Sequence, residues 1–226
     1  MTYNTGPKIV TDGLVLCLDV ADTNSYPRTG TVWYDLSGNA NNGTITGATF
    51  DGGNNGSFSF DGDADYIDCT KIGSTGDISI CAFIRPSSYD VAPQHNPRIF
   101  MNYDGVNDIQ IILRESSKFV WGSNTLSQGA GTTNLPELNT WTHIAVTRSS
   151  SNYTIYYNGI VQTVTATTPG NPSPTSQILR IGADIQNTSS NGHFNGLIAN
   201  CGIYNRALST DEVRRNYNAT KGRFGL

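Results

Sequence analysis

Short apolar runs separated by turn-forming residues recur along the whole chain, and this spacing constrains the fold more than any other feature. Strands of this length, bounded by Gly, Asn, Ser and Pro, are typical of a β-sandwich or barrel. The clearest pair is Tyr153–Tyr157 and Ile160–Thr165, joined by Asn158-Gly159. Asn-Gly between β-branched and aromatic residues predicts a hairpin, because both turn residues must adopt positive φ. The sequence therefore predicts an all-β chain.

The same pattern predicts further strands on both sides of this hairpin. They are Leu14–Asp19, Thr44–Ile45, Ser57–Phe60, Tyr66–Cys69, Ile78–Arg85, Arg98–Tyr103, Ile109–Arg114, Lys118–Gly122, Trp141–Ser149, Ile178–Gly182 and Leu197–Tyr204. The 226 residues fit one all-β sandwich, which commonly has ~200–250 residues. No Pro/Ser-rich linker divides the chain. We expect a single domain over residues 1–226, with an N-terminal arm at 1–12 and a C-terminal helix and tail at 209–226.

Helical signals are confined to the C-terminal end. Ser209 and Glu212 have the spacing of a capping box, in which the hydroxyl accepts from the third helical N–H and the carboxylate accepts from the N-cap N–H. Leu208 and Val213 occupy the positions of a hydrophobic staple around this cap. The sequence therefore predicts one short helix that begins after Ser209.

The charge pattern argues against nucleic acid as a partner. Formal net charge is −4 and only 14% of residues are charged, so there is no basic stripe to displace counterions from phosphates. Arg214, Arg215, Lys221 and Arg223 do cluster near the last helix, where cations complement the helix C-terminus. No apolar run reaches the ~20 residues of a membrane span. The N-terminus lacks the basic and apolar regions of a signal peptide, so we expect a protein made in the cytoplasm without membrane insertion.

The four cysteines fall inside apolar strand runs and form no C-x-x-C or His/Cys cluster, which argues against zinc. Cys17 and Cys201 could face each other if the first and last strands are neighbours. Without a signal peptide, buried free thiols are favoured over disulfides.

Several motifs occur in a fixed order along the chain. They are Asp35-x-Ser-Gly38 with Asn42-Gly43, Phe60-Asp-Gly62 with Asp65-Tyr-Ile67, Trp141-Thr-His-Ile-Ala-Val146, Ile155-Tyr-Tyr-Asn-Gly159, and Phe194-x-Gly196 through Glu212. From about Gly13 to Tyr217 this set resembles the concanavalin-A-like, laminin-G-like jelly roll. The resemblance implies a two-sheet antiparallel sandwich with adjacent termini. It also implies binding of glycans, proteins or capsid surfaces, often with calcium at the rim.

The terminal segments narrow this resemblance. Residues 6–16 (GPKIVTDGLVL) and 216–226 (NYNATKGRFGL) resemble the termini of laminin-G-like virion proteins of tailed bacteriophages. The resemblance implies a structural or binding module on the virion surface, as capsid decoration or cement or in a tail or fibre. Its partners would be other virion proteins and a host surface glycan or protein. A symmetric homo-oligomer would suit such an assembly.

Calcium could bind at two oxygen-rich turns. Asp61, Asp63 and Asp65 alternate as in an EF-hand loop, but the glycine and glutamate that such a loop requires later are missing. A hairpin turn in which Asp65 bonds local backbone is favoured. Asp22 and Asp35, with Asp19 nearby, form the second candidate, and Asx turns are the alternative explanation there. No metal ligands are assigned and no other cofactor is expected.

Aromatic residues in or near loops are the candidates for ligand contact. We predict Trp33, Tyr34, Tyr89 and Tyr103 as the ligand-binding residues, because an aromatic ring beside polar donors is a suitable surface for a sugar. Packing in the core or rim is the alternative role for each of them. No catalytic residue is predicted.

The related fold also includes glycosidases, which use a pair of carboxyl groups. The chain has three glutamates, Glu115, Glu137 and Glu212, and lacks the Glu-x-Asp-x-x-Glu pattern of the family's glucanases. Neither His95 nor His193 has a serine or cysteine partner at a spacing that suggests a nucleophile–base pair. We therefore expect a non-enzymatic virion module, with a glycan-binding lectin-like domain as the alternative and a glycosidase as the third hypothesis.

Overall fold

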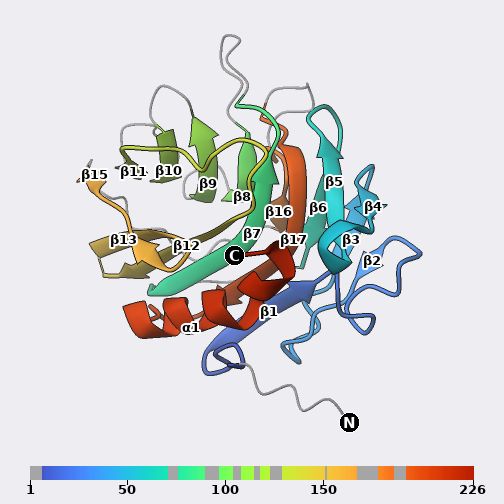
Figure 1. Cartoon of the computed structure of the whole chain (residues 1–226), viewed down its shortest axis with the longest axis horizontal. Helices are drawn as coiled ribbons and strands as arrows, with labels where there is room; N and C mark the ends of the chain where they lie inside the picture. The colour runs from blue at the N-terminus through green and yellow to red at the C-terminus, as the bar shows by residue number, and fades with distance from the viewer. Residues whose placement is uncertain are drawn as a thin grey trace.

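The chain forms two antiparallel β-sheets packed face to face, with one short α-helix outside them in the described residues (Figure 1). The computed structural model describes residues 7–70, 76–89, 97–103, 108–114, 118–122, 129–150, 152–166, 178–185 and 192–226. Within these residues, sheet A has eight strands in the order β14 (Ile160–Val161), β13 (Asn152–Tyr157), β12 (Thr142–Ser149), β7 (Ile78–Pro86), β17 (Asn195–Tyr204), β5 (Ser57–Asp61) and β4 (Thr49–Asp51), with β1 (Leu14–Asp19) also paired to β17. Sheet B has nine described strands in the order β15 (Val164–Ala166), β11 (Gly129–Thr132), β10 (Lys118–Gly122), β9 (Asp108–Arg114), β8 (Arg98–Tyr103), β16 (Leu179–Ile181), β6 (Tyr66–Cys69), β3 (Gly43–Thr46) and β2 (Val32–Trp33). The predicted all-β jelly-roll sandwich is confirmed.

Alternation along the strands decides which side chains enter the core. In β6, Ile67 and Cys69 lie in the core, whereas Tyr66 and Asp68 are partly exposed. Successive strand residues point to opposite faces, so each sheet has an inner face toward the core and an outer face.

One apolar cluster fills the space between the two sheets. Phe58, Ile80 and Ile144 reach it from sheet A, and Phe100 and Ile181 reach it from sheet B. All five side chains are fully buried. Burial of one such side chain contributes about 1.5–3 kcal/mol, so this cluster holds the two sheets together.

Helix α1 (Thr210–Thr220) and the 3-10 helix η2 (Lys221–Phe224) lie on the outer face of sheet A (Figure 1). Val213 packs into an apolar cluster on this face, and Phe224 stacks on Phe83 with 4.2 Å between ring centroids. No helix within the described residues combines the length and the apolar character that a membrane span requires. The predicted C-terminal helix is confirmed.

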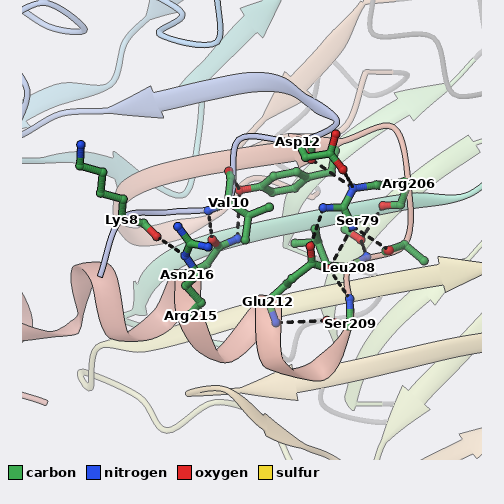
Figure 2. Close-up of polar contacts among 12 residues, drawn as sticks. Lys8, Val10, Asp12, Ser79, Arg206, Leu208, Ser209, Glu212, Arg215 and Asn216 are labelled. Carbon is green, nitrogen blue, oxygen red and sulfur yellow. Dashed lines mark hydrogen bonds and ion pairs between the residues drawn. The ribbon is translucent and has the colours of Figure 1, made fainter. Parts of the chain in front are cut away.

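The described part of the N-terminal arm, residues 7–12, lies beside α1 (Figure 2). Val10 N–H donates to Asn216 Oδ1 at 2.8 Å, and Arg215 Nε donates to the Lys8 carbonyl oxygen at 2.7 Å. Asn216 Nδ2 in turn donates to the Tyr204 hydroxyl on β17 at 3.0 Å. The two terminal segments are therefore neighbours on the outer face of sheet A.

The capping box at the start of α1 is present as predicted (Figure 2). Ser209 Oγ accepts from Glu212 N–H at 3.3 Å, and Glu212 Oε2 accepts from Ser209 N–H at 2.8 Å. Arg206 also holds the Glu212 carboxylate, and its hydrogen bonds lower the pKa of Glu212 to about 2. The staple residues Leu208 and Val213 are both buried in the same cluster.

We expect Ser209→Ala to lower the free energy of unfolding by about 1 kcal/mol, because a helical N–H loses its acceptor. Urea denaturation followed by circular dichroism measures this loss. The exposed helix position Asn218 provides the control, and Asn218→Ala should leave stability within about 0.5 kcal/mol. An equal loss in both variants would contradict a specific role for the cap.

The structure divides one predicted strand and adds short ones. Ile160–Thr165 was predicted as one strand, but Ile160–Val161 pairs with β13 in sheet A and Val164–Ala166 pairs with β11 in sheet B. Periodicity shows which face of a strand is apolar and not which sheet the strand joins, so this crossing was not visible in the sequence. β2, β4 and β11 were also missed, because two to four residues are too few for a periodic pattern.

The four cysteines are free thiols. β1 and β17 are neighbours, with Cys17 opposite Gly202 and Leu18 opposite Cys201. Cys17 and Cys201 nevertheless do not face each other, because Cys201 points into the core and Cys17 lies on the outer face. Burial raises the pKa of Cys17 to about 12, so this thiol is unreactive at neutral pH.

Candidate functional site

Trp33 and Tyr34 were both predicted to contact a ligand, but one is buried and the other is exposed. Trp33 is 0% exposed, and its ring meets Phe58 edge-on with 5.0 Å between ring centroids. Trp33 is therefore a core residue, because alternation along β2 directs it inward and a buried indole presents no face to a ligand. Tyr34 directly follows β2 and is 45% exposed, so its ring is accessible.

Tyr89 and Tyr103 were the other two aromatic candidates. Tyr89 packs against the core, and its enclosed hydroxyl has no hydrogen-bond partner among the described residues. Burial raises the pKa of Tyr89 to about 12, and the nearby Glu137 acts in the same direction. The Tyr89 hydroxyl is therefore a neutral donor at physiological pH. Tyr103 ends β8, and its side chain lies outside the described part of the structure.

The aspartates of the 61–65 turn bond to local backbone. Asp65 Oδ2 accepts from Asp61 N–H at 2.9 Å, and Asp61 Oδ1 accepts from Asp63 N–H at 2.8 Å. The sequence left two interpretations of this turn, a calcium site and a hairpin turn. These contacts are the ones expected for a hairpin turn.

The acids of the early loop also have partners within the protein. Asp22 Oδ1 accepts the N–H of the residue two positions on, and Asp35 Oδ1 accepts Cys17 N–H at 2.8 Å. Asp19 Oδ1 pairs with Arg223 Nη1 at 2.6 Å. In the part of the chain that the structure describes, no group of three or more His, Cys, Asp or Glu side chains is placed to hold a metal ion.

Two of the three histidines lie in the described residues. His143 is 3% exposed and sits 5.0 Å from Phe83 between ring centroids, and burial lowers the pKa of His143 to about 3. His193 is also buried, and its Nδ1 has no partner there. His95 lies outside the described residues. A neutral buried imidazole such as His143 acts as a packing group.

The two outer faces of the sandwich differ in what covers them. Residues 7–12 of the N-terminal arm, α1 and η2 cover the outer face of sheet A (Figure 1). No helix of the described residues packs on the outer face of sheet B. A surface for a large ligand is therefore to be sought on sheet B.

Four charged side chains form a continuous network on this outer face. Arg180 on β16 binds Asp68 on β6 through Nε–Oδ1 at 2.7 Å and Nη2–Oδ2 at 2.9 Å. Arg180 Nη1 donates to the Asp184 carbonyl oxygen at 3.2 Å, and the Asp184 carboxylate pairs with Arg98 Nη2 on β8 at 3.0 Å. We call these four residues the Arg–Asp cluster. The Arg180–Asp68 pair is bidentate, and bidentate guanidinium–carboxylate pairs are strong and fix geometry.

An aromatic ring and two hydroxyls lie next to the Arg–Asp cluster. The Arg180 guanidinium carbon lies 4.0 Å from the ring centroid of Tyr66, a cation–π contact that holds this ring in place. On the neighbouring strand β3, Thr46 is opposite Tyr66 and Thr44 is opposite Asp68, and both threonines are exposed. The surface thus combines an oriented ring with hydroxyl, carboxylate and guanidinium groups.

Toward β8 and β9 the same face becomes buried. Met101 and Gln110 are opposite each other on these strands and are nearly inaccessible. Ile185 N–H contacts Met101 Sδ at 3.5 Å, so the segment that follows β16 covers part of β8. Gln110 Oε1 accepts from Arg98 Nε at 3.4 Å. The accessible part of the site is therefore its β3 and β6 side.

This arrangement suits binding better than proton transfer. A binding site needs a few well-placed polar groups around an apolar or aromatic surface, and Tyr66 with its neighbours provides them. Both oxygens of Asp68 accept from Arg180, and Asp184 pairs with Arg98. A carboxylate held against a guanidinium in this way can still accept a further hydrogen bond, but it is poorly available as a nucleophile or a general base.

Sequence reasoning missed the Arg–Asp cluster. One signal was present, since Asp68 and Arg180 are polar residues between apolar neighbours, as on the outer face of a strand. Their pairing joins positions separated by 112 residues, and only the strand order brings β6 and β16 together.

A cavity of about 60 Å³ lies elsewhere, between the outer face of sheet A and α1. Cys17, Cys81, His143, Tyr204 and Asn216 contribute to its lining. Pockets that bind small molecules usually enclose about 300 Å³ or more. We therefore assign this cavity to the packing of α1 and not to ligand binding.

Comparison with known proteins places the chain in a structural context. A family model described as the concanavalin A-like lectin/glucanases superfamily matches residues 61–214, which is more than half of the chain. A search of curated protein sequences finds no match.

Several solved structures share the fold. Domain 4 of AbnA, a GH43 extracellular arabinanase from Geobacillus stearothermophilus in complex with arabinotriose, has 19% identity and a TM-score of 0.73, over 90% of this chain and 98% of that chain. The binding domain of Paraclostridial Mosquitocidal Protein 1 has 20% identity and a TM-score of 0.70, over 92% of this chain and 52% of that chain. Trypanosoma rangeli sialidase with 2,3-difluorosialic acid has 16% identity and a TM-score of 0.69, over 98% of this chain and 36% of that chain. This chain thus spans about half of the second protein and about a third of the third.

Proposed function

Because the chain belongs to the concanavalin A-like lectin/glucanases superfamily, we propose that it is a non-enzymatic carbohydrate-binding module. Its glycan ligand lies on the outer face of sheet B, over β3 and β6. The observation that carries the proposal is the position of Tyr66, held by Arg180 and flanked by the exposed Thr44 and Thr46. Tyr34, exposed beside the edge strand β2, extends this surface.

The comparisons support a glycan as ligand. The AbnA domain that aligns over 98% of its length is described in complex with arabinotriose. The mosquitocidal-protein match is described as a binding domain. These neighbours share the fold at low identity, so the choice of sugar must come from this chain's own surface.

The distribution of carboxyl groups supports a non-enzymatic role. Glycosidases need two carboxyl groups that flank the scissile bond. Glu212 is held by the helix cap and by Arg206, and Asp68 and Asp184 are each paired with an arginine. Glu115, the acid whose mutation would test hydrolysis, lies outside the described residues.

Tyr66→Ala should weaken glycan binding about tenfold or more, because an aromatic contact at the centre of an interface commonly contributes above 1 kcal/mol. A glycan array identifies a ligand, and isothermal titration calorimetry then compares the two proteins. Ile160→Ala, at an exposed position of β14 in sheet A, is the control and should bind normally. Unchanged affinity in a folded Tyr66→Ala protein would refute this location for the site.

The enzymatic alternative has its own test. The wild-type protein should release no reducing sugar from β-glucans and no sialic acid from sialosides. Hydrolysis that Glu115→Gln abolishes would replace the binding proposal with a glycosidase.

We propose in addition that the module is carried on the surface of a tailed-bacteriophage particle, as capsid decoration or in a tail or fibre. The resemblance of residues 6–16 and 216–226 to the termini of such proteins supports this location. The placement of these segments is compatible with it, because the described arm and α1 both lie on the outer face of sheet A. Attachment through that face would leave the surface around Tyr66 free for a host glycan.

Mass spectrometry and immunogold labelling of purified particles test the location. We expect the protein in many copies on intact particles, retained through a density gradient. Its absence from particles that infect normally would reject the virion proposal and leave the carbohydrate-binding proposal in place.

A further inference from the structure

We propose that this carbohydrate site selects uncharged glycans and rejects acidic ones, because Asp68 and Asp184 occupy the arginines that would otherwise bind a carboxylate. The inference rests on the proposed function and names its ligand class. Uncharged here means sugars that carry only hydroxyl and acetamido groups, in contrast to uronic and sialic acids.

The protein's own groups engage all three guanidinium nitrogens of Arg180, through three of its five N–H donors. Its Nε and Nη2 both bind the Asp68 carboxylate, and its Nη1 binds the Asp184 carbonyl oxygen. The face of its guanidinium lies against Tyr66. Arginine recognises carboxylates best through a bidentate edge of this planar set of donors, and here Asp68 holds the Nε–Nη2 edge.

Arg98 is also engaged by the protein's own groups, through one carboxylate and one side-chain amide. Its Nη2 pairs with Asp184 at 3.0 Å and its Nε donates to Gln110 at 3.4 Å. The side chains of Arg98 and Asp184 are 13% and 10% exposed, so this pair lies deeper than the Asp68 pair. A carboxylate on the ligand therefore meets a cluster of two cations and two anions, whose formal charge is zero.

A ligand that approaches this surface meets its charges in a defined order. At 26%, Asp68 is the most exposed side chain of the Arg–Asp cluster, and its partner Arg180 is 16% exposed. An acidic sugar that approaches over β3 and β6 thus meets an anion before it meets a cation. The overall charge of −4 adds to this repulsion. A neutral sugar instead finds hydroxyls, a carboxylate acceptor and a ring, all in place before binding.

Asp68 is therefore the specificity-determining residue, and its replacement should change the ligand class. In Asp68→Asn the side chain keeps its shape but loses its charge, which leaves Arg180 with an excess positive charge. Specificity of this kind is set by a repulsive element as much as by an attractive one. We expect the variant to gain at least about tenfold in affinity for acidic polysaccharides, the effect of one new charged pair.

Affinity electrophoresis and biolayer interferometry would compare wild type and variants on arabinan, β-glucan and mannan as neutral probes, and on polygalacturonate and polysialic acid as acidic probes. Wild type should bind a neutral probe with an affinity that stays constant between about 20 and 500 mM NaCl, because the ligand carries no charge that salt can screen. Asp68→Asn should bind acidic probes, and added salt should abolish that binding. Asp211→Asn makes the same change in net charge at a 91% exposed position on α1 and should gain nothing. The double variant Asp68→Asn/Arg180→Gln should lose the gain.

The outcomes separate the two proposals. Salt-sensitive binding of wild type to an acidic probe would overturn the selectivity inference and retain the carbohydrate-binding function. An Asp68→Asn protein that folds, binds neutral probes and gains no acidic binding would overturn the role of Asp68. Failure of wild type to bind any glycan would overturn the proposed function together with the inference. If the variant does not fold, the binding of wild type to the acidic probes, measured at low and high salt, still tests the selectivity inference.

Discussion

Trp33→Ala is expected to lower the free energy of unfolding by about 3–5 kcal/mol, the usual cost of removing a buried aromatic side chain. Trp33 is fully buried and packs edge-on against Phe58, so alanine leaves a cavity between the two sheets. Equilibrium unfolding in urea measures the loss, because the midpoint moves while the slope stays nearly constant.

Tyr34→Ala is the matched control one residue away. Tyr34 is 45% exposed, so its loss should change stability by no more than about 0.5 kcal/mol while it weakens glycan binding. Equal stability in the two variants would contradict the assignment of Trp33 to the core. Normal glycan binding in Tyr34→Ala would remove Tyr34 from the candidate surface.

A fall in pH should destabilise the protein through His143. Burial lowers the pKa of this imidazole from its ordinary value of 6.5 to about 3, so the unfolded chain takes up a proton that the folded chain rejects. Stability is therefore unaffected above pH 6.5 and falls as the pH drops from 6.5 toward 3. Between pH 7 and pH 5 this one group should cost about 2 kcal/mol.

Comparison of wild type with His143→Gln isolates this contribution, since glutamine does not titrate. Urea denaturation at pH 7 and pH 5 gives the change in unfolding free energy for each protein. The variant should lose about 2 kcal/mol less than wild type over this interval, whatever its stability at pH 7. The same pH dependence in both proteins would show that His143 is accessible or already paired in the folded state.

Local sequence patterns were sufficient to predict most of the fold. Asn158-Gly159 predicted a hairpin turn, and both residues do adopt positive φ, 50° at Asn158 and 74° at Gly159. Ser209 and Glu212 placed the start of the helix, and both of their reciprocal hydrogen bonds are present. These features depend on residues that are close together in the sequence, so they can be predicted from one sequence alone.

The candidate site could not be predicted in the same way. Tyr66 and Asp68 were visible only as alternating strand residues, and nothing local identifies Arg180 as their partner. Trp33 was predicted to contact a ligand and is instead buried in the core. Its strand, β2, has two residues and gives no periodic signal that would have shown this. Contacts between distant strands depend on the order of strands in the sheet, and that order is a property of the whole fold.

The most direct test of the account is an NMR titration of the isotope-labelled protein with the neutral oligosaccharide that binds tightest on a glycan array. We predict chemical-shift changes that gather on β3 and β6 around Thr46, Tyr66 and Asp68, with little change in α1. Changes confined to α1 and the N-terminal arm would contradict the central claim that the outer face of sheet B binds carbohydrate. Complete absence of shifts with every array ligand would contradict it equally.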